Sequence, residues 1–280
     1  MRLLALDFDG VICDSAPETF VVGLRTYVGL HPSSRFSECR DLLCPEPPSA
    51  ARIRADQLYR AFVELMPLGN RAEDFGVVLA ALDAGEALPD QPGYDLFRSR
   101  LPDPWLARFH ERFYLERASL AERSPEGWHA LMACYSELLA LLRRRDGAAE
   151  LAIATAKDRA SVRALLARYG ASELFPEERV LDKETGVSKL AHLELLAERC
   201  GVPFPEITFV DDKLNHLQSA ATLGVRCALA SWGYNGPREA AAARDRGFLV
   251  CTLQDFEAQI FSQAVPENGP RARDAADSAG

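Results

Sequence analysis

Two carboxylates, Asp7 and Asp9, stand one residue apart in the opening segment M-R-L-L-A-L-D-F-D-G-V. The apolar run at 3–6 predicts a buried strand that leads directly into them. Like charges repel, and a carboxylate is costly to remove from water, so this is an unusual way for a buried strand to end. Asp and Gly are also ordinary turn residues. The pair therefore lies either in a solvated turn or in a site that needs concentrated negative charge.

Polar residues at the ends of two other strand-like runs favour the second interpretation. One run ends at Thr155 and another ends in the pair Asp211 and Asp212, while Lys189 begins the helical segment before this last run. In an open parallel sheet, ligands bind at the carboxyl ends of the strands. We therefore expect these side chains to gather with the two opening carboxylates at one edge of a sheet.

The second half of the chain alternates between strand-like and helical segments. Ser188 is a suitable N-cap for the strongest helical pattern, and Gly170 and Gly201 are natural helix stops. This alternation predicts a parallel sheet with helices on both faces. The strand-like runs lie at 150–156, 178–182, 206–212, 226–233 and 248–253, and the helical patterns at 159–170, 188–201 and 215–223.

Between the first strand and Pro125, helical patterns alternate with Pro- and Gly-rich breaks, and no convincing strand is present. This change predicts a helical insertion, after which the core resumes near Trp128 with 130–145 as the helix that leads into the second strand. The predicted fold class is α/β, with a Rossmann-like parallel sheet core and an inserted all-helical cap domain. The predicted divisions are 1–14 and 126–261 for the core, 15–125 for the cap, and 262–280 for a disordered tail.

Four motifs follow one another along the predicted core: D-F-D-G-V at 7–11, A-T-A-K at 154–157, S-K-L at 188–190 and V-D-D-K at 210–213. Their order, spacing and placement at strand ends resemble those of the haloacid dehalogenase (HAD) superfamily of phosphohydrolases, and phosphoglycolate phosphatase-like members in particular. The resemblance covers the core. It implies a HAD-like fold in which a cap, inserted after the first motif, sets the choice of substrate.

The resemblance also implies a role for each motif residue. Asp7 would attack phosphorus to give an aspartyl-phosphate intermediate, and Asp9 would protonate the leaving oxygen and then activate the hydrolytic water. Thr155 and Ala156 would bind the phosphoryl group. Lys189 would neutralise the charge on that group and on the nucleophile.

A divalent cation is expected because a phosphate monoester is anionic and resists nucleophilic attack. Mg²⁺ is the implied cofactor, since it prefers oxygen ligands. The implied metal ligands are the carboxylate of Asp7, the backbone carbonyl of Asp9 and the carboxylate of Asp212. Asp211 would act through water or as a second ligand.

Several neighbouring residues have two interpretations each. Lys183 rivals Lys189 as the phosphate-binding lysine, although a Lys in the first turn of a helix is electrostatically unfavourable, and this favours a functional Lys189. Lys157 either reaches the substrate or is solvated. Asp14 and Ser15 are expected to cap the first helix of the insertion rather than to touch the substrate. The segment W-G-Y-N at 232–235 resembles a loop of phosphoglycolate phosphatase-like members and is expected to pack at a turn.

Asp9 favours phosphoryl transfer, because the resemblance implies that dehalogenases need neither a second Asp in the first motif nor a metal. The first lysine of the chain is Lys157, so the insertion offers no lysine for the Schiff base of phosphonate-cleaving relatives. The predicted function is Mg²⁺-dependent hydrolysis of a small phosphorylated metabolite, phosphoglycolate-like. A sugar phosphomutase and a catalytically silent, phosphometabolite-binding or regulatory protein are the alternatives. Five arginines of the insertion could bind a substrate anion or be solvated: Arg25, Arg35, Arg40, Arg52 and Arg54.

Composition restricts the partners. The formal net charge of -9 makes nucleic acid and anionic membranes poor partners, and no apolar stretch is long enough to cross a bilayer. The seven cysteines are scattered, without a C-x-x-C pair, which is typical of reduced thiols. We expect a cytoplasmic enzyme, a monomer or a homodimer, whose partner is its small phosphorylated substrate.

Overall fold

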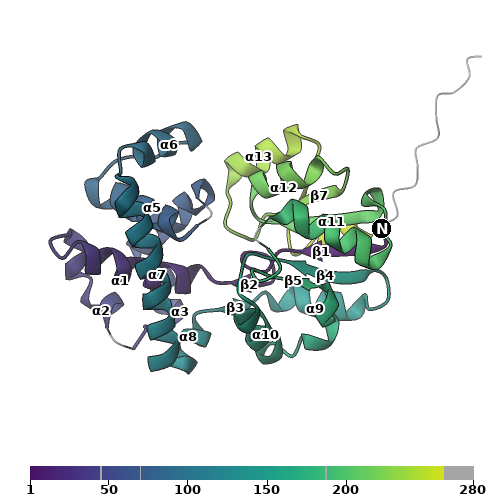
Figure 1. Ribbon diagram of the computed structural model, residues 1–280, viewed down its shortest axis with the longest axis horizontal. Coiled ribbons are helices and arrows are strands. Elements are labelled where there is room, and N and C mark those ends of the chain that lie inside the picture. The colour runs from purple at the N-terminus through teal and green to yellow at the C-terminus, as the bar shows by residue number, and fades with distance from the viewer. Residues whose placement is uncertain (45, 70, 187, 262–280) are drawn as a thin grey trace, which may run out of the picture.

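The computed structural model describes residues 1–44, 46–69, 71–186 and 188–261 (Figure 1). Its centre is a six-stranded sheet of order β5-β4-β1-β6-β7-β8, in which every neighbouring pair is parallel. This confirms the predicted α/β class. The strands are β1 (Leu3–Leu6), β4 (Glu150–Ala154), β5 (Val180–Leu181), β6 (Ile207–Asp211), β7 (Arg226–Ala230) and β8 (Leu249–Cys251).

Strand β1 lies in the middle of the sheet because its four residues are all apolar, and all four are fully buried. Successive side chains point to opposite faces, so Leu4 and Leu6 join one apolar cluster while Leu3 and Ala5 join another. The helices that carry the chain between strands cover both faces. Helices α9 (Ser136–Arg144), α10 (Arg159–Arg168) and α14 (Phe256–Phe261) contribute to the first cluster, and α11 (Lys189–Cys200), α12 (Leu214–Ala221) and α13 (Pro237–Asp245) to the second.

The insertion after β1 is helical, as predicted. In Figure 1 its helices form a separate layer beside the carboxyl end of the sheet. Aromatic contacts join its long helices, such as Phe20 with Phe62 at 5.3 Å and Phe75 with Phe113 at 5.9 Å between ring centroids. The helices are α1 (Ala16–Leu30), α2 (Arg40–Leu43), α3 (Ala50–Ala55), α4 (Gln57–Leu65), α5 (Ala72–Ala84), α6 (Gln91–Ser99), α7 (Asp103–Arg123) and α8 (Pro125–Ala130), with 3₁₀ turns at Arg35–Glu38 and Met66–Leu68.

A two-stranded antiparallel ribbon marks where the chain leaves the sheet layer and returns to it. Strand β2 (Cys13–Asp14) pairs with β3 (Ala133–Cys134). The prediction of one continuous helix over 130–145 is therefore wrong: α8 ends at Ala130, β3 follows, and α9 begins at Ser136. Pairing with a segment about 120 residues away along the chain outweighs the local helical pattern, as tertiary context often does. The predicted domain boundaries at 14/15 and 125/126 remain a prediction.

Other predicted elements match within a few residues. The Ser188 hydroxyl accepts a hydrogen bond from the Ala191 amide at the start of α11, and Gly201 ends that helix in the left-handed conformation. The predicted tail at 262–280 lies outside the described residues. Among the helices that the structure describes, none combines the length and the apolar character needed to span a bilayer.

Candidate active site

The structure brings the sequence-predicted residues together at the carboxyl end of β1. They line a cavity of about 180 Å³ between the sheet and the helical insertion: Asp7, Asp9, Thr155, Ala156, Lys189 and Asp212. Asp211 is fully buried behind the cavity wall, where it forms an ion pair with the cavity-lining Lys189.

Lys189 joins the carboxylates of two strands. Its Nζ lies 2.5 Å from Asp7 Oδ1 and 3.4 Å from Asp211 Oδ2, and donates to the backbone carbonyl of Ala154 at 2.6 Å. Burial alone would lower the pKa of this amine, but the two carboxylates outweigh burial and raise the pKa. The side chain therefore remains a cation at the end of the strand that carries Asp7.

The acidic residues titrate differently because their partners differ. Burial raises the pKa of Asp7 to about 6, opposed by Lys189 and supported by the negative charge of Asp211. Burial likewise raises the pKa of Asp212 to about 7. Asp211 is also buried, yet its pKa is lowered, since His216 Nδ1 lies 3.0 Å from its Oδ2 and Lys189 is on its other side. Burial is therefore the main reason why Asp7 and Asp212 bind a proton more readily than a solvated Asp.

Asp9 has its own partner. Lys157 Nζ lies 3.1 Å from Asp9 Oδ1, and the lysine side chain is 2% exposed. Burial would raise the pKa of Asp9, but Lys157 and, further off, Arg117 lower it. Of the two interpretations of Lys157, the solvated one is wrong, because this lysine forms a buried ion pair at the cavity wall.

The rival lysine, Lys183, lies elsewhere. It is exposed, and its Nζ is 4.6 Å from the ring centroid of Tyr114 on α7. Of these two candidates, Lys189 is the one whose ammonium contacts Asp7.

Two glycines make room for Asp212. A Cβ at Gly10, whose φ is +82°, would lie 2.5 Å from Asp212 Oδ2, and a Cβ at Gly233 would lie 2.4 Å from Asp212 Cβ. The amide of Tyr234 donates to Asp212 Oδ2 at 2.9 Å. The segment 232–235 therefore packs at a turn, as expected, and that turn also holds a carboxylate of the site.

Tyr234 also ties this turn to the helical insertion. Its hydroxyl accepts hydrogen bonds from the amides of Ser15 at 2.5 Å and Ala16 at 2.9 Å, at the start of α1. The capping expectation is confirmed for Asp14, whose Oδ1 accepts from the Ala16 amide at 3.3 Å, and is wrong for Ser15, whose hydroxyl makes no capping bond. A tyrosine more than two hundred residues away along the chain supplies the acceptor for the Ser15 amide.

Sequence reasoning missed three residues that the structure places at the site. His216 contacts Asp211, Arg117 of α7 lines the cavity, and Lys213 donates to the backbone carbonyls of Met66 at 2.7 Å and Gly69 at 3.3 Å. The sequence contained a signal for His216, because this histidine follows the V-D-D-K motif within one helical turn. None of the five arginines singled out in the sequence is among the residues that line the described cavity: Arg25, Arg35, Arg40, Arg52 and Arg54.

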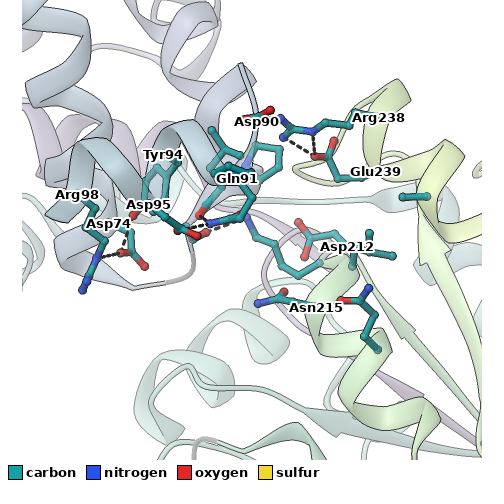
Figure 2. A pocket seen from close by; sticks show the side chains of 18 of the residues that line it. Asp74, Asp90, Gln91, Tyr94, Asp95, Arg98, Asp212, Asn215, Arg238 and Glu239 are labelled. Atoms are coloured by element: carbon teal, nitrogen blue, oxygen red, sulfur yellow. Dashed lines mark hydrogen bonds and ion pairs between the residues drawn. The ribbon is translucent and has the colours of Figure 1, made fainter. Parts of the chain in front are cut away.

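A larger cavity of about 650 Å³ adjoins the first, between α6 of the insertion and α12 and α13 of the sheet layer (Figure 2). Both cavities are lined by Asp212 and Lys213. Figure 2 shows two ion pairs among the lining residues of the larger cavity, Asp74 with Arg98 on the side of the insertion and Glu239 with Arg238 on the side of the sheet layer. Asp212 and Lys213, which line both, therefore separate this space from the cavity that Asp7 and Asp9 line.

The donor set fits a hard divalent cation. Ligand atoms of Asp7, Asp211 and His216 all lie within 4.8 Å of one another, and Asp212 lines the same cavity. Carboxylate oxygens suit Mg²⁺. Burial raises the pKa values of Asp7 and Asp212, and a bound cation would favour the charged forms of both carboxylates.

Comparison with known proteins agrees with this geometry. The haloacid dehalogenase-like hydrolase family model matches residues 1–224. No curated protein matches the chain.

Solved structures of low sequence identity share the fold. A predicted phosphoglycolate phosphatase from Haemophilus somnus has 17% identity and a TM-score of 0.58, covering 92% of this chain and 97% of its own. A haloacid dehalogenase-like family hydrolase from Streptococcus pneumoniae has 11% identity and a TM-score of 0.59, covering 92% and 98%. A predicted phosphatase from Clostridium acetobutylicum has 10% identity and a TM-score of 0.59, covering 92% and 97%. The chain belongs to the haloacid dehalogenase-like hydrolase family.

Proposed function

We propose that this protein is a Mg²⁺-dependent phosphatase that hydrolyses a small phosphorylated metabolite, phosphoglycolate-like, through an aspartyl-phosphate at Asp7. One observation carries the proposal. The buried carboxylate of Asp7 lies at the end of the central strand with the Lys189 ammonium 2.5 Å away, and Asp9 lines the same cavity. That combination offers a nucleophile, a cation for the phosphoryl group and a proton carrier.

The proposed metal ligands are the carboxylates of Asp7, Asp212 and Asp211 and the backbone carbonyl of Asp9. A divalent cation bound there would supply charge neutralisation for the phosphoryl group. His216 would hold Asp211 in place from behind, since its Nδ1 lies 3.0 Å from Asp211 Oδ2.

The chain's own residues would carry the two steps. In the first, an Asp7 oxygen attacks phosphorus, the bond from phosphorus to the ester oxygen breaks, and Asp9 gives its proton to the departing oxygen. In the second, Asp9 takes a proton from water, whose oxygen attacks phosphorus, and the bond to Asp7 breaks to release phosphate. Thr155, Ala156 and Lys189 would bind the phosphoryl oxygens, because they line the same cavity.

The Asp9–Lys157 ion pair sets a condition on the first step. As long as Lys157 stays 3.1 Å away, the pKa of Asp9 is lowered and the carboxyl holds no proton at neutral pH. A phosphoryl group competes for the Lys157 ammonium. Drawing that ammonium away raises the pKa of Asp9 toward the value that a general acid needs.

Turnover of p-nitrophenyl phosphate, with and without Mg²⁺, tests the proposal, together with a panel of small phosphometabolites. We expect hydrolysis that depends on Mg²⁺ and is abolished in Asp7→Asn, which keeps the size of the side chain but removes the nucleophile. Absence of metal-dependent turnover across the panel would contradict the proposal and favour a catalytically silent binding protein. Transfer of phosphate between sugar positions, with little free phosphate released, would favour a phosphomutase.

A further inference from the structure

Arg117 stands out among the cations around the smaller cavity. It comes from α7, on the opposite side of the cavity from β1, and its side chain is 16% exposed. Its Nε lies 2.8 Å from Oε1 of Glu18, which is itself buried and also accepts from Trp128 Nε1 at 2.9 Å. Glu18 therefore fixes the plane and direction of the guanidinium.

The terminal nitrogens of this guanidinium remain available. Among the described residues, the Glu18 carboxylate is the hydrogen-bond partner of Arg117, and it takes the Nε–H. The lysines of the cavity are committed differently: Lys157 pairs with Asp9, Lys189 with Asp7, and Lys213 donates to backbone carbonyls of the insertion. Arg71 also lines the cavity, but its side chain is 76% exposed and reaches Glu73 only at 3.9 Å. Arg117 is thus the largely buried cavity arginine, within the described chain, that has donors to spare for a ligand.

Size and geometry restrict what those donors would meet. With a phosphoryl group beside Asp7 and Lys189, a substrate that stays within this cavity extends toward the insertion, where Arg117 lies. The cavity of about 180 Å³ then has space for only a few further heavy atoms. Two parallel N–H groups of a guanidinium match the two oxygens of a carboxylate.

We propose that Arg117 is a specificity residue that binds a carboxylate of the substrate, so that small phosphorylated hydroxy acids are preferred over uncharged phosphate esters. This inference rests on the proposed function for the position of the phosphoryl group. It deepens that function by naming the residue that selects a substrate with a carboxylate.

Binding of a matched pair of non-hydrolysable phosphonates tests the inference independently of turnover. 3-Phosphonopropionate carries a carboxylate where 3-methylbutylphosphonate carries an uncharged isopropyl group of similar size. Calorimetry of the wild-type protein with Mg²⁺ should show the carboxylate compound binding about 10- to 100-fold more tightly, the range expected for a charged, bidentate hydrogen-bonded pair. Arg117→Met should remove most of that difference while leaving the affinity for 3-methylbutylphosphonate nearly unchanged.

Two further variants make the test specific. Arg112→Met removes the same charge from an exposed position of α7 and should preserve the difference between the two compounds. Arg117→Lys keeps the positive charge beside Glu18 but loses the two parallel N–H groups, so it should retain only part of the difference in affinity between the two compounds. This variant replaces Arg117→Met in the test if Arg117→Met melts at a much lower temperature than wild type. Equal affinities in the wild type, or an unchanged difference in both Arg117 variants, would overturn the inference. Phosphonate discrimination without hydrolysis of any ester would overturn the phosphatase proposal alone.

Discussion

Replacement of Lys189 by Met examines the centre of the proposed site. At an effective dielectric constant of about 20, unit charges at the observed separations of 2.5 Å and 3.4 Å attract by about 7 and about 5 kcal/mol. Desolvation of the ammonium offsets most of this, and breaking a buried ion pair typically costs about 3–5 kcal/mol. Methionine has a similar length, so packing changes little and the lost charge dominates.

Protonation of Asp7 limits the loss of stability in Lys189→Met. With a pKa of about 6, Asp7 takes up a proton at pH 7 for about 1.4 kcal/mol even in the wild type, and for less once the lysine is gone. Because the pKa of the folded variant is raised further, its free energy of unfolding relative to wild type should decrease as the pH rises from 6 to 8. We expect a loss of about 2–4 kcal/mol at pH 8 and a smaller loss at pH 6.

The same protonation removes the nucleophile. Turnover of p-nitrophenyl phosphate at pH 7 should therefore fall about a hundredfold or more in Lys189→Met. Urea denaturation at pH 6 and pH 8 measures the stability, and initial rates with Mg²⁺ measure the activity. Lys183→Met is the matched control: it loses only an exposed cation–π contact with Tyr114, worth about 0.5–1 kcal/mol, and should keep its turnover. A Lys189→Met protein as active as wild type, or inactivity confined to Lys183→Met, would refute the reasoning.

Three other variants probe the surroundings of the site. Gly233→Ala places a methyl group 2.4 Å from Asp212 Cβ. We expect weaker Mg²⁺ dependence of turnover, and a free energy of unfolding in urea that is lower by about 1–3 kcal/mol. In the control Gly236→Ala the new Cβ meets nothing nearer than 3.5 Å, so this variant should behave as wild type. Tyr234→Phe removes the acceptor of the buried Ser15 amide and leaves the Ala16 amide only its longer bond of 3.3 Å to Asp14 Oδ1. This should lower the free energy of unfolding by about 1–3 kcal/mol, and an unchanged thermal melting temperature would contradict the role of Tyr234. Burial lowers the pKa of His192 to about 4, below the value of an unfolded His. The free energy of unfolding should therefore fall by at most about 3 kcal/mol between about pH 6.5 and pH 4, as the unfolded chain binds a proton that the folded chain does not. His192→Leu should flatten this part of the pH–stability curve, and curves of equal slope for the variant and the wild type would exclude the assignment.

Much of the fold could be predicted because its signals are local. The apolar runs before Asp7 and Asp211 are as long as buried strands, and all their residues proved to be buried. Ser188 and Gly201 bracket α11 as a cap and a stop. The ribbon of β2 and β3 could not be predicted, because each strand has only two residues and is stabilised by a partner far away in the sequence.

The sequence by itself determined which residue types gather at the sheet edge, since parallel strands bring their carboxyl ends to one side and the motifs are placed at those ends. Only the tertiary structure placed Lys189 rather than Lys183 beside Asp7, paired Lys157 with Asp9 and placed Arg117 at the cavity wall. These outcomes depend on the directions of long side chains and on contacts between segments about 100 or more residues apart along the chain. No local pattern of apolar and polar residues records such contacts, because they form only when the helical insertion packs over the end of the sheet.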